Sequence, residues 1–291
     1  MAKEAWGRWG ECDERGAVNL IDLPKVKAAA HLVGEGRVIS LAQPLSPGTP
    51  MPKHRAPMIH LMGRDGGDYA AGGKRPGGFQ FAEDTMVVPT HFGTHIDALC
   101  HAWYDDALYN GFSGNTIRST TAATRCGIDK MGPIVTRGVL LDLVRVNGAP
   151  LAPGTPIGKS EIRSALDAAG AELRAGDAVL LRTGWLENVL GTSEVDFSAE
   201  PGIDVDAAEF LAEAGAAMIG ADNFAVEVLP FASGKVFPVH QRLIRDFGIP
   251  LLEGAMLKPL AETGATVFCL VAAPLPIVGG TGSPLTPIAI L

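Results

Sequence analysis

The chain has 291 residues, 47% of them hydrophobic, and its 24 basic and 32 acidic residues give a formal net charge of −8. This length allows one large domain or two small ones with a sizeable core, and the acidic balance, with no Lys/Arg-rich run, argues against a nucleic-acid partner. No apolar run reaches the roughly 18 residues of a membrane span or forms a secretion signal, and the four cysteines include no C-x-x-C pair. We therefore expect a cytoplasmic protein without a membrane partner, a disulfide framework or a thiolate metal site.

Residues 1–36 are predicted to form an N-terminal helical packing segment, followed by a domain that spans residues 37–291. The segment contains one helix, Leu23–Leu32, whose second residue is a proline, as suits a first helical turn. Alternating apolar residues predict a strand at Arg37–Ala42. The glycine-rich stretch that follows, centred on residues 61–79, is predicted to be a long loop. Because long loops in compact domains are often functional, it is either a flap over a pocket or a plain surface excursion.

Candidate metal ligands are densest in V-P-T-H-F-G-T-H-I-D-A-L-C-H-A-W, which holds His91, His95, Asp97 and His101. Imidazole and carboxylate are the ligands that Zn²⁺ or Mn²⁺ takes. A proline, a glycine and two β-branched residues argue against a helix here. In an extended chain, residues at even spacing share a side, so a strand would point all four side chains one way. The alternative is a set of structural histidines, but imidazoles crowded on one face repel unless an anion or a metal lies among them.

Downstream of this stretch, predicted strands alternate with predicted helices. Ser160 and the Asp206/Glu209 pair suit helix starts, and Gly170 and Gly248 suit helix ends. Such alternation predicts an α/β fold with a mixed sheet and helices outside it. The predicted strands are Val139–Val144, Ala178–Arg182, Ala217–Ala221, Ile249–Glu253 and Val267–Ala273, and the predicted helices are Ser160–Ala169, Asp206–Ala214 and Pro238–Phe247.

His240 and Glu253 are expected to meet at one edge of this sheet despite their separation in sequence. In a helix-then-strand step, the helix begins at the edge where the following parallel strand ends, and these residues occupy those two positions. Ligand sites in such sheets gather beyond the carboxyl ends of strands. His91 follows a predicted strand at Thr85–Val88 and Asp222 follows Ala217–Ala221, so both would lie at a similar edge if those strands are parallel to Ile249–Glu253. The alternative for His240 is a water-exposed residue at a helix start.

The chain resembles the cyclase or kynurenine-formamidase-like family of metal-dependent hydrolases, which includes isatin hydrolases and a trans-dienelactone hydrolase. The family hallmark H-x-G-T-H-x-D-x-x-x-H is matched at every defined position from His91 to His101. G-A-V-N-L-I, L-L-R-T-G-W and A-A-P-L-P-I-V-G-G-T-G-S-P extend the match over most of the chain. Pro52 stands where kynurenine formamidases have an aromatic residue, and those compact enzymes lack the glycine-rich insertion. The longer, isatin-hydrolase-like branch is therefore the closer analogy.

This resemblance implies a swivelling β/β/α-type domain, usually oligomeric, so that a homodimer or homotetramer is expected. It makes His91, His95 and Asp97 the ligands of a first metal ion, Zn²⁺ or Mn²⁺. In members with two ions, Asp97 bridges to a second ion that His240 and Glu253 hold. His101 matches the position that serves as acid or base beside the metal.

The expected activity is hydrolysis of an amide, lactam or lactone bond in a small cyclic or aryl carbonyl substrate by metal-activated water. Two alternatives remain open: a metal-dependent lyase or isomerase that stabilises an enolate at the same site, and a non-catalytic protein stabilised by its metal. Phe92, Trp103 and Phe224 are candidate substrate contacts, although such residues are more often part of the core. Cys100 is expected to be a buried apolar residue rather than a nucleophile.

Overall fold

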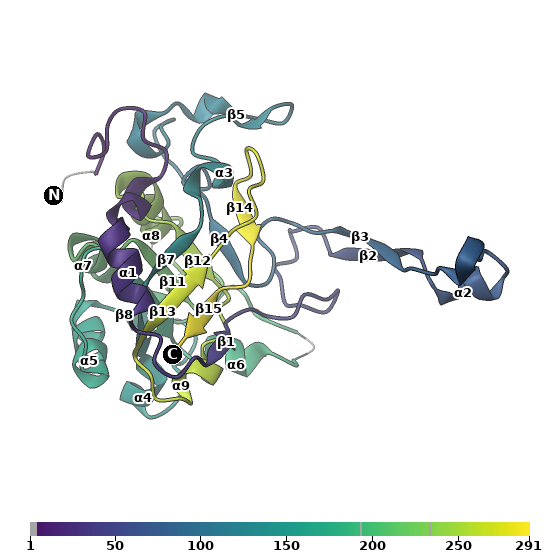
Figure 1. Ribbon diagram of the computed structural model, residues 1–291. Helices are drawn as coiled ribbons and strands as arrows, with labels where there is room; N and C mark the ends of the chain where they lie inside the picture. Colours follow the sequence, from purple (N-terminus) through teal and green to yellow (C-terminus); the bar gives the residue numbers. More distant parts are fainter. Residues whose placement is uncertain (1–4, 193, 233) are drawn as a thin grey trace.

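A nine-stranded mixed sheet forms the centre of the computed structural model, which describes residues 5–192, 194–232 and 234–291 (Figure 1). Its strand order is β1-β15-β13-β7-β9-β11-β12-β4-β14. The four consecutive strands β7, β9, β11 and β12 are parallel, and the remaining pairs are antiparallel. The strands are β1 Val38–Ser40, β4 His95–Asp97, β7 Ile134–Asp142, β9 Ala178–Arg182, β11 Met218–Ala221, β12 Leu251–Glu253, β13 Val267–Ala272, β14 Gly282–Pro284 and β15 Ile288–Ile290.

Helices flank this sheet, which confirms the predicted single-domain α/β fold. Helix α1 packs on β7 and β13, and α5 packs on β7, so the N-terminal segment belongs to the same body as the sheet. No helix within the described ranges is long and apolar enough to cross a membrane. The helices of the body are α1 Leu23–Ala30, α3 Ile128–Met131, α4 Leu143–Asn147, α5 Lys159–Ala169, α6 Trp185–Val189, α7 Val205–Glu213, α8 Pro238–His240, the π-helix η5 Gln241–Asp246 and α9 Lys258–Ala261.

The shorter elements lie in the connections. Among the described residues they include two antiparallel strand pairs, one parallel strand pair and four 3₁₀ turns. The strands are β2 Ile59–Arg64 with β3 Glu83–Val87, β5 Ile117–Arg118 with β6 Ala122–Ala123, and β8 Pro156–Ile157 with β10 Gly202–Ile203. The turns are η1 Gly16–Leu20, η2 Pro76–Gly78, η3 Tyr109–Gly111 and η4 Gly114–Thr116, and a short helix, α2, spans Gly66–Ala70.

The N-cap residues predicted for two helices are wrong by two positions, although the helices begin within one residue of the prediction. Helix α5 begins at Lys159 after Gly158, and the Oγ of the predicted cap, Ser160, instead lies 2.9 Å from Glu161 Oε2. Helix α7 is capped by Asp204, whose carboxylate accepts a hydrogen bond from Ala207 N at 2.8 Å. The cap lies upstream of the predicted one because β10, which pairs with β8, ends at Ile203. Asp204 is the next residue, so the helix is capped there.

Strand ends also differ from the prediction in places. The sequence V-L-L-D-L-V was predicted as one strand, but β7 ends at Asp142 and the last two residues begin α4. The carboxylate of Asp142 accepts a hydrogen bond from Arg145 N at 3.0 Å, which starts this helix. The C-terminal tail, which had no predicted element, supplies β14 and β15.

Residues 59–87 form an arm, not the loop that was predicted. Strands β2 and β3 pair as a hairpin, and α2 and η2 lie near its tip. Figure 1 shows the arm projecting away from the sheet, so it is a surface excursion and not a lid on the body of its own chain. Strand β3 overlaps the predicted strand Thr85–Val88, whereas β2 fell within the stretch that was predicted as a loop.

Candidate metal centre

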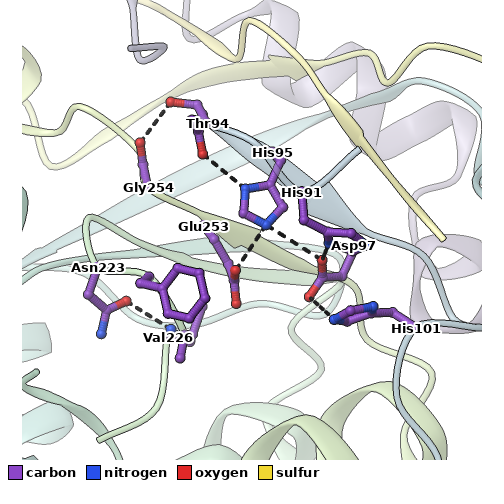
Figure 2. A network of polar contacts seen from close by, with 12 residues as sticks. His91, Thr94, His95, Asp97, His101, Asn223, Val226, Glu253 and Gly254 are labelled. Carbon is purple, nitrogen blue, oxygen red and sulfur yellow. Dashed lines mark hydrogen bonds and ion pairs between the residues drawn. The ribbon is translucent and has the colours of Figure 1, made fainter. Parts of the chain in front are cut away.

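Strand register places the first ligands of the centre. Strands β12 and β4 are antiparallel, and Glu253 stands directly opposite His95, so their side chains share one face of the sheet. His95 Nε2 lies 3.0 Å from Glu253 Oε2 and 3.8 Å from Asp97 Oδ1 (Figure 2). The intervening Ile96 points to the opposite face and is fully buried.

The prediction of one strand carrying all four motif side chains is wrong, since β4 contains only His95 and Asp97 of the four. Gly93 adopts a left-handed φ of 58° and bends the chain before β4, while a turn closes after it through the hydrogen bond from His101 N to Ala98 O. The side chains meet all the same. His91 Nδ1 lies 2.8 Å from Asp97 Oδ1, and His101 Nε2 lies 3.9 Å from Asp97 Oδ2.

His240 completes the cluster from the other side of the fold. Its Nε2 lies 3.2 Å from Glu253 Oε1 and 3.7 Å from Asp97 Oδ2. The prediction that His240 and Glu253 meet at one edge of the sheet is therefore confirmed. It held because β11 and β12 are parallel and α8 begins at the edge where β12 ends. Asp222 follows β11 at this edge, but its carboxylate accepts hydrogen bonds from Thr183 and Gly184 instead.

Hydrogen bonds fix which nitrogen of each imidazole faces the cluster. A carbonyl or carboxylate oxygen only accepts, so His95 Nδ1 donates to Gly93 O at 2.9 Å and His240 Nδ1 donates to Glu227 Oε1 at 2.6 Å. In the neutral form of each ring, the Nε2 lone pair would then point at an oxygen of Glu253. Two lone pairs that face each other repel unless a proton or a metal cation lies between them.

Unpartnered buried atoms identify the same place. Within the part of the chain that the structure describes, five buried side-chain nitrogen or oxygen atoms lack a hydrogen-bond partner, and four of these belong to His91, His95 and Asp97. Buried polar atoms are rarely left in this state in native proteins. His91 Nδ1 and Asp97 Oδ1 are close yet lack hydrogen-bond geometry, as expected of two atoms that are both directed at a third. The donors present therefore fit a divalent metal ion.

The donor atoms fall into two groups of three that share Asp97. One group is His91, Asp97 and His101, and the other is His95, Asp97 and Glu253, with the atoms of each group within 4.8 Å of one another. A carboxylate common to both groups suits a bridge between two ions. This grouping differs from the first-ion set implied by the resemblance, which joined His91 to His95 and kept His101 apart. The assignment of each residue to an ion stays a prediction.

The pKa values of the cluster follow from burial and mutual attraction. Burial would raise the pKa of Asp97, but His101 and His91 outweigh it and hold that pKa well below 3.8. Burial would lower the pKa of His240, yet its hydrogen bond with Glu227 helps to raise that pKa well above 6.5. At His101, burial prevails over the attraction of Asp97 and lowers the pKa to about 4. The His101 imidazole is therefore neutral at pH 7.

A cavity of about 260 Å³ opens beside the cluster and gives it access to a small molecule. The side chain of His101 is 29% exposed toward this space, while those of Asp97 and His240 are almost completely buried. Of the three predicted substrate contacts, Phe224 lines the cavity, whereas Phe92 and Trp103 do not. Phe92 lies in the core, and Trp103 is at the surface. The lining residues are Arg55, His101, Ala102, Phe224, Ala225, Phe237, His240 and Glu253.

One wall of the cavity is a shaped loop that the sequence did not indicate. Glu200 accepts hydrogen bonds from Phe224 N at 3.0 Å and Ala225 N at 2.7 Å, and Asn223 Oδ1 accepts one from Val226 N at 2.8 Å (Figure 2). Val226 has a left-handed φ of 60°, which is costly for a β-branched residue. Strain of this kind is retained where surrounding structure enforces it, most often at functional sites.

Four site residues escaped sequence reasoning: Glu227, Glu200, Arg55 and Phe237. Glu227 orients His240 from the loop after β11, and Arg55 reaches the cavity from the loop before the arm. Neither stands in a motif or a periodic pattern. The only available signal for Glu227 was its position in the segment that follows the predicted strand Ala217–Ala221, where ligand sites gather.

Comparisons with known proteins agree with this geometry. The model of the "Putative cyclase" family matches residues 39–228, more than half of the chain. A crystal structure described as a novel cyclase superposes with a TM-score of 0.92 and 36% identity, covering 99% of this chain and 98% of that one. The isatin hydrolase of Roseibium aggregatum is 29% identical over 223 residues, which are 72% of this chain and 75% of the relative.

A more distant structure, described as a potential metal-dependent hydrolase with cyclase activity, shares the fold. It has a TM-score of 0.56 and 22% identity over 87% of this chain and 98% of that one. The hallmark motif, the shared fold and the family match agree along most of the sequence. The chain therefore belongs to the cyclase family.

Proposed function

We propose that the protein is a metal-dependent hydrolase that opens an amide, lactam or lactone bond in a small cyclic or aryl carbonyl compound. The observation that carries this proposal is the cluster of buried, unpartnered donor atoms of His91, His95 and Asp97 beside an accessible cavity. The relative named isatin hydrolase supports a cyclic amide as the substrate type. Bound Zn²⁺ or Mn²⁺ would polarise the substrate carbonyl and lower the pKa of water from about 15.7 toward 7.

His91, His95, Asp97, Glu253 and His240 would hold one or two such ions. Their buried carboxylates offset the charge of the metal, and hydrogen bonds from Nδ1 direct Nε2 of His95 and of His240 toward it. A purely structural metal site is closed, with every position filled by protein. The cavity beside this cluster favours a catalytic site instead, because it leaves room for a substrate.

His101 is the candidate acid and base. Its imidazole faces the cavity and is neutral at pH 7, since burial lowers its pKa to about 4, so it can accept the proton of the attacking water. The carboxylate of Asp97, 3.9 Å from His101 Nε2, would stabilise the imidazolium that forms. The same nitrogen can then donate the proton to the departing amine or alkoxide. Such proton transfer contributes about 10²–10⁴-fold to a rate.

Replacement of His101 by alanine separates these roles. We expect His101→Ala to bind metal in the same ratio as the unaltered protein and to lose about 10²–10⁴-fold in kcat. Metal content and turnover of a panel of lactones, aryl formamides and isatin-like lactams measure the two effects. Unchanged turnover with bound metal would refute the acid/base role, and loss of the metal would make His101 a ligand, as the group His91, Asp97 and His101 allows.

A further inference from the structure

Arg55 places a cationic group in the cavity beside the metal cluster. It lines the cavity together with His101 and Glu253, and its guanidinium donates a hydrogen bond from Nη1 to the backbone carbonyl of His91. The carbon at the centre of the guanidinium lies 4.8 Å from the centroid of the Phe224 ring. This stacking and the bond to His91 fix the direction of the guanidinium.

The guanidinium has no carboxylate partner among the described residues. None of their Asp or Glu oxygens lies within 4.0 Å of its nitrogens, and the bond to His91 is its one hydrogen bond to them. Arginine has five N–H donors in a planar fork, so most of them remain available. A half-buried guanidinium with free donors and a cavity in front of it is suited to a planar anion.

The charge of the site leads to the same conclusion. Asp97 and Glu253, together with Glu227 behind His240, carry three negative charges, which one divalent ion and Arg55 would balance. A second ion would give the site a net positive charge. Burial lowers the pKa of Arg55 while Glu253 and Asp97 oppose that effect, and arginine stays protonated in proteins. A positive cavity with low-dielectric walls attracts and retains anions.

The remaining walls favour a flat apolar group next to that anion. Phe224 and Phe237 both line the cavity, and Phe237 packs edge-on against His240 with ring centroids 4.9 Å apart. Phe237 holds a left-handed φ of 48°, a strained conformation for an aromatic residue. The backbone thus places this ring at the cavity despite the cost.

We propose that Arg55 determines specificity by binding a carboxylate that the substrate carries on its ring, apart from the carbonyl that is hydrolysed. The inference rests on the proposed hydrolase function and narrows it to anionic substrates. Arg55 and His101 both line the cavity, and in this proposal Arg55 selects the substrate while His101 moves protons. The uncharged substrate isatin, after which the relative is named, lacks such a group.

Binding of benzoate and benzamide tests the inference independently of turnover. The two probes share a planar ring and differ in charge. We expect calorimetry on the metal-loaded protein to show benzoate binding at least tenfold more tightly than benzamide. One charge-assisted pair of hydrogen bonds to the guanidinium is strong enough to give a difference in affinity of this size. In Arg55→Met the preference should fall below about threefold, and Arg55→Lys should retain part of it. Arg64→Met is the matched control, because Arg64 also lies over a phenyl ring, 5.1 Å from the Phe81 centroid, but on the arm.

Metal content and circular dichroism of each variant show whether His91 has shifted. A benzoate preference that persists in a folded, metal-loaded Arg55→Met protein would overturn the inference, because the metal itself would then bind the anion. Equal binding of both probes to the unaltered protein would overturn it too.

Turnover of 5-oxotetrahydrofuran-2-carboxylate and of its methyl ester separates this inference from the proposed reaction. We expect the carboxylate to have a KM at least tenfold lower, and Arg55→Met to remove that advantage with little change in kcat for the ester. Hydrolysis of both without preference would refute the role of Arg55 and leave the reaction intact. If neither compound nor any lactam is hydrolysed while the benzoate preference depends on Arg55, the reaction is wrong and the anion site stands.

Discussion

Glu227 offers a sensitive test of how the metal cluster is held together. Its carboxylate is 1% exposed and accepts three hydrogen bonds, from His240 Nδ1 at 2.6 Å, His240 N at 3.0 Å and Val239 N at 3.1 Å. Glu227→Gln keeps the size of the side chain but removes its charge. If the amide oxygen stays with His240, the amide NH₂ must face the N–H of Val239, and two donors then oppose each other.

The magnitude of the effect follows from these contacts. One lost hydrogen bond to a charged group, with a buried donor left unpaired, costs about 1–3 kcal/mol in stability. The neutral amide also holds the His240 ring less firmly with Nε2 toward Glu253. Losing a partner of this kind behind a metal-ligating histidine lowers metal affinity by about 10–100-fold. We therefore expect weaker metal binding and a lower free energy of unfolding in the same variant.

Competition with a chromophoric chelator measures the metal affinity, and denaturant unfolding measures stability. Glu209→Gln is a suitable control, because Glu209 also accepts a hydrogen bond, from Arg242 at 2.7 Å, but its side chain is 32% exposed and its partner is not a residue of the cluster. Unchanged metal affinity in folded Glu227→Gln would show that Glu227 does not orient a metal ligand. A loss of stability alone would assign it a purely structural role.

Two further predictions concern other parts of the fold. Burial raises the pKa of Asp222 from 3.8 to about 6, so the stability it contributes is complete below about pH 3.8 and falls by about 3 kcal/mol as the pH rises through about 6. Because asparagine does not ionise, the unfolding free energy of Asp222→Asn should rise by up to about 3 kcal/mol relative to that of the unaltered protein between about pH 4 and pH 7. Denaturant unfolding at several pH values measures this, and a difference between the two proteins that stays constant with pH would contradict it. On the arm, Ile59, Leu61 and Val87 share one face and are 47%, 60% and 58% exposed, and an isolated hairpin is marginally stable. We predict a homo-oligomer that Leu61→Asp dissociates, and sedimentation of the unaltered protein as a 30.4 kDa monomer would refute it.

The central strands and the convergence of the ligands could be predicted because local patterns determine them. Ala178–Leu181 is an unbroken apolar run that, with Arg182, becomes β9 with the predicted bounds, as expected for a parallel strand covered on both faces. His240 and Glu253 could be paired across the chain because the helix-then-strand geometry fixes which edge each occupies. Their contact at 3.2 Å follows from topology and needs no knowledge of loops.

The parts that failed depend on tertiary contacts. The left-handed bend at Gly93 breaks the expected strand, and a Cβ there would lie 2.8 Å from Leu45 Cδ2, a neighbour that the sequence does not reveal. Arg55 reaches the cavity only because its loop folds back onto His91. The hairpin escaped prediction because the glycine-rich stretch between its strands indicated a loop, and only part of β3 was predicted as a strand. Loops and exposed elements therefore supply the residues that distinguish this site, while the sheet supplies three of the proposed ligands, His95, Asp97 and Glu253.

The measurement that most directly tests the account is the metal content of the purified protein together with its ring-opening activity before and after chelation. Asp97 is common to both groups of donors, so Asp97→Asn should lose all bound metal. We predict one or two divalent ions per chain, hydrolysis of at least one lactone, lactam or aryl formamide, loss of that activity on chelation and its return when Zn²⁺ or Mn²⁺ is restored. A metal-free protein that hydrolyses these compounds equally well, or an Asp97→Asn protein that retains metal and full activity, would contradict it.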